Sequence, residues 1–456
     1  MSTPLKIAII GAGPTGTLLA RLLHLSSPPL PTPLSITIYE AEPSPNYRSQ
    51  GDTLDLHTST GLAALKEANL FQEFLAHARY DGHHIQFTDR MLKSYLTVVG
   101  AAKPREEEEG DGGTRRKRSK MEDQRPEIDR GDLRRLLVES LPEGMIRWGH
   151  KVVEVRRGAL EMEVVFSGEG QMPERGFSLV VGADGTWSRT RAAVSEQRPG
   201  FSGVGMWELS VPDAEVRAKE LKEAVQGGSI FAHAERRRIS VQQMGDGSLS
   251  VGVMEAQEEE DWAAKEKCGY DVGDLEVVKG KLLEGEGAPF GGDWHPLLRE
   301  AVEKAEGRCI PRSLWELPVG WRWEHREGVT LIGDAAHVMT PFAGEGVNVG
   351  MEDAMRLARG VVRALKGGGG GVAEPLDAAV RAYEEEMWPR SEKVARLSHD
   401  LGKLYMFEPN TPESIIARTT ALHLKFDQPR MAHPLVDGMV HGLFLFKRMT
   451  GGAVVV

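Results

Sequence analysis

Three glycines near the amino terminus have spacings that suit phosphate binding: Gly11, Gly13 and Gly16. They follow a short apolar segment, residues 6–10, and precede a helical pattern over residues 17–23. In a strand, turn and helix of this kind, the first glycine permits the tight turn and the second lets the backbone approach a pyrophosphate. The third lets the helix pack on the strand, and the helix start offers N–H groups and a partial positive charge. The motif predicts a dinucleotide site, and a glycine turn that binds nothing is the alternative for this motif taken alone.

An acidic residue ends the next predicted strand. Residues 34–39 are largely apolar and β-branched, and Glu40 follows them, where its carboxylate is placed to accept hydrogen bonds from a ribose. The distance from the glycines to this acid exceeds the usual roughly 20 residues, because the proline-rich segment 26–33 lengthens the loop.

Two further apolar segments end in polar corners. Residues 177–181 lead to Asp184, and residues 328–332 lead to Gly333 and Asp334. Continuous apolar runs are typical of parallel strands buried on both faces, and ligands bind at the carboxyl ends of such strands. Asp184 and Asp334 are therefore candidate ligand contacts, with the capping of turns as the alternative. We expect nearby His337 to be a packed or hydrogen-bonded structural histidine rather than a base.

Composition limits the class of protein. At 456 residues, the chain is long enough for two lobes, and residues 201–307 alternate as in an antiparallel sheet with helices. A net charge of −11 disfavours nucleic acid as a partner. Two cysteines are too few for a disulfide framework or a metal cluster and favour the cytoplasm.

Two segments stand apart from these lobes. Residues 100–124 hold an acidic block and then a basic one, which indicates a solvated loop, with a nuclear localisation signal as the alternative. The apolar segment 435–446 is shorter than the roughly 18 residues of a spanning helix, so we expect it to pack in the core or lie on the surface.

The three corners, in this order, resemble the FAD-dependent aromatic hydroxylases, the group A flavoprotein monooxygenases. A narrower resemblance, to the tetracycline-inactivating flavin monooxygenases, rests on residues 51–57, 126–134 and 333–348. It covers most of the chain, apart from residues 100–124 and the last 50 or so.

The resemblance implies an α/β fold with a discontinuous, Rossmann-like FAD-binding domain of the glutathione-reductase type. That domain would comprise residues 1–90, 125–200 and 308–375, with a mixed sheet-plus-helix substrate domain inserted at 201–307 and C-terminal helices over 376–456. The charged loop is 100–124. We expect a monomer without a transmembrane segment.

The resemblance also assigns residues. Glu40 would hold the adenosine ribose, Arg130 and Asp55 would contact FAD, and Arg48 would contact NADPH. Asp334 would bind the ribitol chain, Gly333 would allow close approach, and Asp184 matches a motif associated with FAD and the nicotinamide coenzyme. The helix beginning at Gly346 and Val347 would direct its N–H groups at the flavin pyrimidine. A surface role for Arg48 and a helix N-terminal charge for Arg130 are the alternatives.

The reaction implied is the transfer of hydride from NADPH or NADH to FAD, capture of O₂ as a flavin C4a-hydroperoxide, and hydroxylation of an aromatic or polyketide-like small molecule. No catalytic side chain is required. Candidates for the substrate wall are Trp207, Phe231, Met244 and Met254, with Phe342 near the ring, and ordinary core packing is the alternative for each. A flavin oxidase or reductase without oxygen insertion, and a non-catalytic flavoprotein that binds an aromatic ligand, are the alternative functions.

Overall fold

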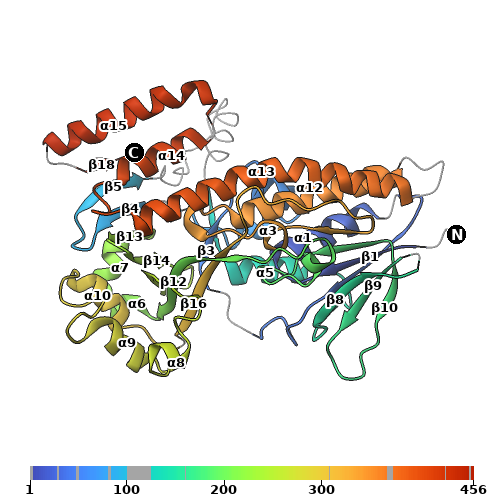
Figure 1. The fold of residues 1–456 in the computed structure, drawn as a ribbon, viewed down its shortest axis with the longest axis horizontal. Coiled ribbons are helices and arrows are strands. Elements are labelled where there is room, and N and C mark those ends of the chain that lie inside the picture. Colours follow the sequence, from blue (N-terminus) through green and yellow to red (C-terminus); the bar gives the residue numbers. More distant parts are fainter. Residues whose placement is uncertain are drawn as a thin grey trace, which may run out of the picture. The chain divides into compact units, whose positions relative to one another are not determined.

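The structure is a computed structural model that describes ten stretches of the chain (Figure 1). They are residues 4–27, 30–47, 51–80, 84–99, 125–159, 161–307, 309–366, 373–426, 428–450 and 453–455. The chain forms two units: unit 1 is Met1–Ala78, Ile128–Gly200 and Trp315–Arg396, and unit 2 is Arg79–Glu127, Phe201–Leu314 and Leu397–Val456. The predicted charged loop 100–124 and Arg48 lie outside the described residues.

A five-stranded parallel sheet organises unit 1. Its order is β17 (Val329–Leu331), β11 (Leu179–Gly182), β1 (Leu5–Ile10), β2 (Leu34–Tyr39), β7 (Ile146–Arg147). All four residues of β11 are buried, as the continuous apolar run predicts. Ile10 is aligned with Tyr39 on one side and Gly182 on the other, and Gly182 with Leu331. The carboxyl ends of four strands therefore share one edge.

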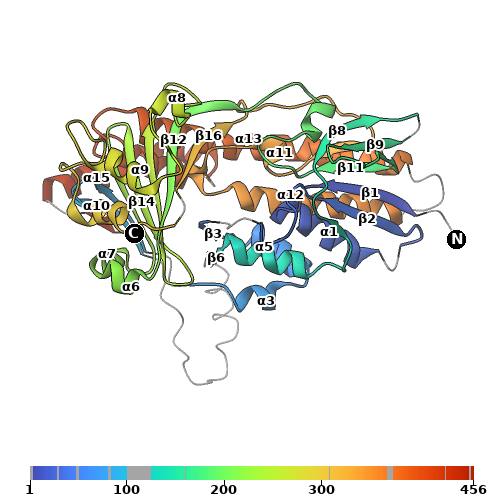
Figure 2. The same cartoon turned by 90° about the horizontal axis from the view of Figure 1, so that it is seen from below.

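Helices cover this sheet. α1 (Pro14–Ser26) packs against α12 (Gly346–Lys366), as both views show (Figures 1 and 2). The other helical segments of unit 1 are α2 (Gly61–Glu67), α3 (Phe71–Leu75), α5 (Arg130–Glu139), η1 (Thr190–Ala193), α11 (Asp334–His337), η2 (Pro341–Ala343) and the first part of α13 (Ala373–Phe407). The buried faces of α1 and α12 join one apolar core with the sheet.

Two small sheets accompany the parallel one. β8 (Val152–Arg157), β9 (Met162–Phe166) and β10 (Glu174–Phe177) form an antiparallel sheet, and β3 (Thr53–Asp55) pairs with β6 (Glu127–Asp129).

An eight-stranded mixed sheet organises unit 2. Its order is β16 (Ile310–Glu316), β12 (Gly200–Val211), β15 (Leu249–Ala256), β14 (Arg237–Gln243), β13 (Ser229–Ala234), β4 (His84–Asp89), β5 (Ser94–Val99), β18 (Val454–Val455). Alternate residues of its strands enter a core with helices, because side chains of a strand point to opposite faces in turn. The short helices are α6 (Ala214–Arg217), α7 (Lys219–Val225), α8 (Lys265–Cys268), α9 (Leu275–Leu283) and α10 (Pro296–Glu303).

The C-terminal segment is mainly helical, as predicted. After α13 come α14 (Ile416–Phe426), η3 (Arg430–Ala432) and α15 (His433–Thr450). None of the helices in the described part of the chain combines the length and hydropathy that crossing a bilayer requires.

The predicted fold class is confirmed, including the parallel sheet and a second sheet with helices. One boundary differs from the contacts observed: β4 pairs with β13 in unit 2, whereas residues up to 90 were expected in the FAD-binding domain. The reason is that β4 is a neighbour of a strand about 140 positions away along the chain, a pairing that no local pattern encodes. The boundaries of independently folding domains stay a prediction.

Candidate functional site

The first corner is tightly packed at two of its glycines. Gly11 has φ +105°, and a Cβ placed on it would lie 2.4 Å from the Ala183 carbonyl oxygen. A Cβ on Gly16 would lie 2.2 Å from the Gly11 carbonyl oxygen. Glycine is therefore required here by the close approach of β1, α1 and the end of β11.

Gly13 differs from both. Its backbone is extended, and a Cβ placed on it would meet no atom of the described residues within 4 Å. Gly13 is also the N-cap of α1, where no described side chain accepts a hydrogen bond from the first turn. N–H groups at a helix N-terminus attract anions. This corner therefore has both the space and the donors that a pyrophosphate requires.

Glu40 lies directly beside that corner. Its Oε2 accepts a hydrogen bond from the Ala12 N–H at 2.7 Å, and its Oε1 accepts one from the Glu42 N–H at 2.9 Å. The carboxylate is thus held at the carboxyl end of β2, next to the glycine turn.

The second corner is held by Asp184. One carboxylate oxygen accepts a hydrogen bond from the Ser188 hydroxyl at 2.6 Å. The other accepts from the backbone N–H groups of Arg189 and Thr190, at 2.8 and 3.0 Å, and from the Thr190 hydroxyl. These contacts cap the turn that leads into η1, and the capping of a turn was the alternative interpretation of Asp184. A contact from Asp184 to the cofactor stays a prediction.

Arg191 joins the second corner to the third, and the sequence patterns did not identify it. Its buried guanidinium donates to the backbone carbonyl oxygens of Thr186, Asp334 and Ala335 at 2.8 to 3.0 Å. Burial lowers the pKa of Arg191, and the carboxylates of Asp184 and Asp334 act in the opposite direction. The side chain of Asp334 itself is exposed at this edge.

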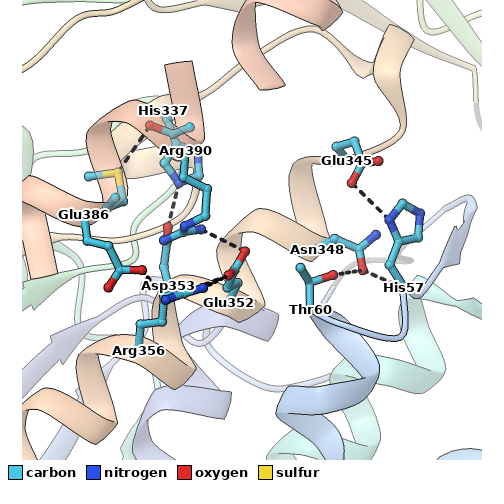
Figure 3. Close-up of polar contacts among 12 residues, drawn as sticks. His57, Thr60, His337, Glu345, Asn348, Glu352, Asp353, Arg356, Glu386 and Arg390 are labelled. Atoms are coloured by element: carbon cyan, nitrogen blue, oxygen red, sulfur yellow. Dashed lines mark hydrogen bonds and ion pairs between the residues drawn. The ribbon is translucent and has the colours of Figure 1, made fainter. Parts of the chain in front are cut away.

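The third corner rests on a buried carboxylate. The Gly333 N–H donates to Asp353 Oδ2 at 3.0 Å. His337 Nε2 lies 2.6 Å from the same oxygen, and Arg390 donates to Oδ1 (Figure 3). Burial by itself raises the pKa of Asp353, but the charges of His337 and Arg390 and the Gly333 N–H outweigh it and lower the pKa below its usual value. His337 is therefore a buried, hydrogen-bonded histidine, as predicted.

Glycines also bring the third corner against both helices. Gly333 has φ +59°, and a Cβ on it would lie 3.1 Å from Thr15 Oγ1 in α1. A Cβ on Gly350 of α12 would lie 2.6 Å from the same oxygen and 3.4 Å from the Gly333 Cα. The corners at Gly11 and Gly333 and the first turns of α1 and α12 therefore form one continuous site.

The N-terminus of α12 is surrounded by polar side chains. Asn348 is fully buried, and its Oδ1 accepts hydrogen bonds from the His57 N–H at 2.9 Å and the Thr60 hydroxyl at 3.2 Å (Figure 3). Its Nδ2 donates to the Asp55 carbonyl oxygen at 2.9 Å. Asn348 thereby fixes the segment after β3 to the helix start. We call Asp55, His57, Thr60, Glu345 and Asn348 the Asn348 cluster.

His57 is the cation of this cluster. Its two ring nitrogens lie 3.0 Å from Asp55 Oδ2 and 3.2 Å from Glu345 Oε2. Burial by itself lowers the pKa of His57, but the hydrogen bonds to Asp55 and Glu345 outweigh it and raise the pKa to about 9. His57 is therefore an imidazolium at neutral pH that holds two carboxylates together.

Arg130 lies at the start of α5. It is the exposed first residue of α5, and its backbone N–H donates to the Asp52 carbonyl oxygen at 3.0 Å, beside the β3 and β6 pair. The structure thus brings together most predicted site residues: Gly11, Gly13, Gly16, Glu40, Gly333, Asp334, Gly346 and Val347. Asp55 is linked to the start of α12 by the hydrogen bond from Asn348 to its carbonyl oxygen. Arg48 lies outside the described residues.

A cavity of about 290 Å³ lies at the other end of the sheet. Its lining includes Leu5, Leu179 and Gly328, at the amino-terminal ends of β1, β11 and β17. Because ligands of open α/β sheets bind at the carboxyl ends, this cavity is not our candidate site.

The predicted substrate wall divides between the two faces of the second sheet. Trp207 packs in the core with the helices of unit 2 and is ordinary core. Phe231 and Met254 alternate to the other face, where the Arg238 guanidinium lies 4.3 Å from the Phe231 ring. Burial lowers the pKa of Arg238 to about 10. Met244 lies in the turn between β14 and β15, and Phe342 is buried in η2.

Known sequences match across most of the chain. A profile of the FAD binding domain family matches residues 4–267 and 301–398. Monooxygenase penA of Penicillium thymicola is 28% identical over 452 residues, covering 90% of this chain and 97% of the relative. Monooxygenase asqM of Emericella nidulans is 29% identical over 439 residues, covering 86% and 94%. Salicylate hydroxylase of Pseudomonas putida is 29% identical over 308 residues, covering 61% and 63%.

Solved structures share the fold. HpxO of Klebsiella pneumoniae, complexed with FAD and uric acid, superposes with a TM-score of 0.67 at 17% identity and covers 96% of each chain. Tetracycline destructase Tet(51) superposes with a TM-score of 0.64 at 16% identity, covering 96% of this chain and 99% of that one.

Proposed function

Because the chain belongs to the FAD binding domain family and is a FAD-dependent monooxygenase, we propose that FAD lies along the carboxyl edge of the parallel sheet in unit 1. The first turn of α1 at Gly13 would hold the pyrophosphate, Glu40 the adenosine ribose and Asp334 the ribitol chain. The first turn of α12, at Gly346 and Val347, would meet the pyrimidine edge of the flavin, where negative charge grows on reduction.

The contrast among the glycines carries this assignment. Gly11, Gly16, Gly333 and Gly350 are required by protein atoms, because an added Cβ on each would lie 3.1 Å or less from a neighbour. Gly13 and Gly346 begin the two helices, and an added Cβ on either would meet no described atom within 4 Å. Packing accounts for the first four glycines, and a ligand that approaches the backbone would account for the other two.

When bound, FAD supplies the electron transfer and the oxygen activation for which protein side chains are unsuited. The protein's contribution is to bind and orient. Asn348 fixes the segment after β3 against α12, and the His57 imidazolium holds the carboxylates of Asp55 and Glu345 in place. The buried Asp353 fixes the Gly333 N–H, and with it the corner that presents Asp334.

The proposal extends to the reductant and the substrate. NADPH, with NADH as the second possibility, would reduce the flavin, and Arg48 would bind the nucleotide phosphate. The organic substrate would be an electron-rich aromatic or polyketide-like small molecule. The relative named salicylate hydroxylase supports the aromatic class. The cytoplasmic location and the monomeric state stay predictions.

Purified protein tests these assignments in two steps. Absorption and fluorescence spectra with added FAD measure binding first, and we expect Asp334→Ala to bind FAD at least about tenfold more weakly, a loss of about 1.4 kcal/mol. Glu327→Ala is the matched control, since Glu327 is an exposed carboxylate at the opposite end of β17. If Asp334→Ala and the control bind FAD with equal affinity, Asp334 does not contact FAD.

Turnover with labelled ¹⁸O₂ and a panel of phenols and aromatic polyketides then separates the functions. A monooxygenase oxidises NADPH faster with its substrate and incorporates one labelled oxygen atom. Stimulated oxidation that gives only hydrogen peroxide indicates an oxidase or reductase, and bound FAD that no nicotinamide coenzyme reduces indicates a ligand-binding flavoprotein. An Arg48→Ala variant with an unchanged Michaelis constant for NADPH would exclude Arg48 from the coenzyme site.

A further inference from the structure

His57 links two carboxylates beside the first turn of α12. One ring nitrogen lies 3.0 Å from Asp55 Oδ2, and the other lies 3.2 Å from Glu345 Oε2 (Figure 3). A neutral imidazole carries only one N–H, so a ring that donates to two carboxylates must hold a second proton. The geometry by itself therefore requires a positive charge on His57, whose side chain is only 14% exposed.

This charge lies at the start of the helix. Glu345 directly precedes Gly346, the first residue of α12. The His57 N–H donates to Asn348 Oδ1, in the first turn of that helix, at 2.9 Å. A Cβ placed on Gly346 would meet no described atom within 4 Å. The imidazolium and its carboxylates therefore lie beside a helix N-terminus that has space for a ligand.

Reduction of a flavin adds negative charge at the pyrimidine end of its ring, the end proposed to lie at this helix start. Hydride transfer from the nicotinamide coenzyme brings two electrons and one proton, and the oxidised coenzyme leaves, so the bound flavin gains one negative charge. A cation near that charge favours the reduced state, and an anion disfavours it. His57 and its two carboxylates therefore act on reduced FAD in opposite directions.

We propose that His57 raises the reduction potential of the bound flavin, because its imidazolium stabilises reduced FAD relative to oxidised FAD. The inference rests on the proposed place of the flavin at the start of α12. Besides holding the two carboxylates in place, the imidazolium offsets their charge where the flavin becomes more negative. Burial opposes this charge, but the hydrogen bonds to Asp55 and Glu345 outweigh burial and raise the pKa of His57 to about 9, so the charge is present at neutral pH.

Anaerobic titration of the FAD-loaded full chain against a redox dye tests the proposal. At pH 6, the variant His57→Gln should bind reduced FAD at least about tenfold more weakly relative to oxidised FAD, which lowers the midpoint potential of a two-electron couple by about 30 mV. Glutamine keeps an N–H donor but carries no charge.

A second variant separates the effect of charge from a general loosening of the site. Glu345→Gln removes a negative charge from the same cluster, so it should raise the midpoint potential where His57→Gln lowers it. Loosening would move both variants in the same direction.

His325→Gln is the matched control. His325 lies 2.9 Å from Asp377 Oδ1 and 2.7 Å from Glu384 Oε2, so this variant also removes an imidazole from between two carboxylates. Its site is at the other end of the sheet, where Asp377 lines the cavity of about 290 Å³. We expect His325→Gln to lower the thermal stability and to leave the midpoint potential unchanged. Circular dichroism shows that each variant is folded.

The wild-type chain provides a test that needs no variant. Asp55 and Glu345 are the charged groups that act on His57. Relative to free FAD at the same pH, the midpoint potential of the bound flavin should fall as the pH rises past about 9, because His57 then loses its proton. The same titration of His57→Gln should lack this fall.

The outcomes distinguish this inference from the proposed function. A wild-type chain that binds no FAD would contradict the proposed function, and this inference with it. Bound FAD with the same midpoint potential in His57→Gln and His325→Gln would contradict this inference alone. Shifts of His57→Gln and Glu345→Gln in the same direction would also overturn it, since they would indicate a structural effect rather than one of charge.

Discussion

The N-termini of α1 and α12 are both expected to face FAD, yet they are built in different ways. At α1, the elements of the site are local: Gly11, Gly13 and Gly16 lie within six consecutive residues, and no described side chain caps the first turn. At α12, Asn348 joins the helix start to Asp55 and His57, which lie more than 290 positions earlier in the chain.

This difference separates two kinds of binding surface. The α1 corner needs backbone geometry, which glycine spacing along the chain encodes directly. The α12 start needs side chains from a distant segment, and these must be hydrogen-bonded because they are buried. We therefore expect substitutions at the α1 corner either to disturb packing or to weaken FAD binding, but not both. Substitutions around the start of α12 should change the free energy of unfolding and its dependence on pH.

The largest effect is expected at Gly16. The variant Gly16→Val places a Cβ 2.2 Å from the Gly11 carbonyl oxygen, so the strand and helix must separate. We expect the free energy of unfolding, measured in urea, to fall by about 3 kcal/mol or more. Gly280→Val is the control, since a Cβ on Gly280 in helix α9 meets no described atom within 4 Å. Similar losses in both variants would show that the α1 corner is not tightly packed.

His57 should make stability depend on pH. Its pKa is about 9 in the folded chain against an ordinary value of 6.5, so the folded state holds the proton more tightly. The contribution is complete below about pH 6.5 and is lost as the pH rises through about 9, with a total of about 3 kcal/mol. Urea unfolding between pH 6 and 10 measures it. His57→Gln should flatten this part of the profile, and exposed His441→Gln should not; a profile unchanged by His57→Gln contradicts the assignment.

Asn348→Ala should have the next largest effect. It removes three hydrogen bonds and leaves the His57 N–H without its acceptor, at a cost of about 2 kcal/mol. Hydrogen exchange should show faster exchange at residues 57–60. Thr60→Val removes one of the three bonds and should cost about half as much. Unchanged exchange in Asn348→Ala would show that the cluster does not hold this segment.

The smallest free-energy change, and the most specific, is expected at Gly13. An Ala fits the protein there, so the stability of Gly13→Ala should stay within about 1 kcal/mol of the wild type. The affinity for FAD should fall about tenfold, or about 1.4 kcal/mol, because the methyl group occupies the space of the pyrophosphate. Titration with FAD, with Gly280→Ala as control, measures this loss. Full affinity in Gly13→Ala would show that the pyrophosphate does not bind at Gly13.

Several parts of the candidate site could be predicted from the sequence because their signals are local. The family match confirms the resemblance drawn from the three corners, and the structure places Gly11, Glu40 and Gly333 at one edge of the sheet. Arg191 and Asp353 gave no such signal. Each is a single charged residue in a helical turn, and it acquires its role only by bonding to the backbone of another corner.

The sequence by itself determined the parallel strands, the glycine turn that opens α1 and the apolar character of α15, because strand periodicity, glycine spacing and composition are properties of neighbouring residues. Only the tertiary structure decided that Arg191 bonds to the third corner, that β4 joins the second sheet, that Asn348 and His57 share one cluster, and which face of α15 stays exposed. The physical reason is that burial and hydrogen bonding between distant segments depend on the tertiary packing of the whole chain, and local sequence patterns do not encode that packing.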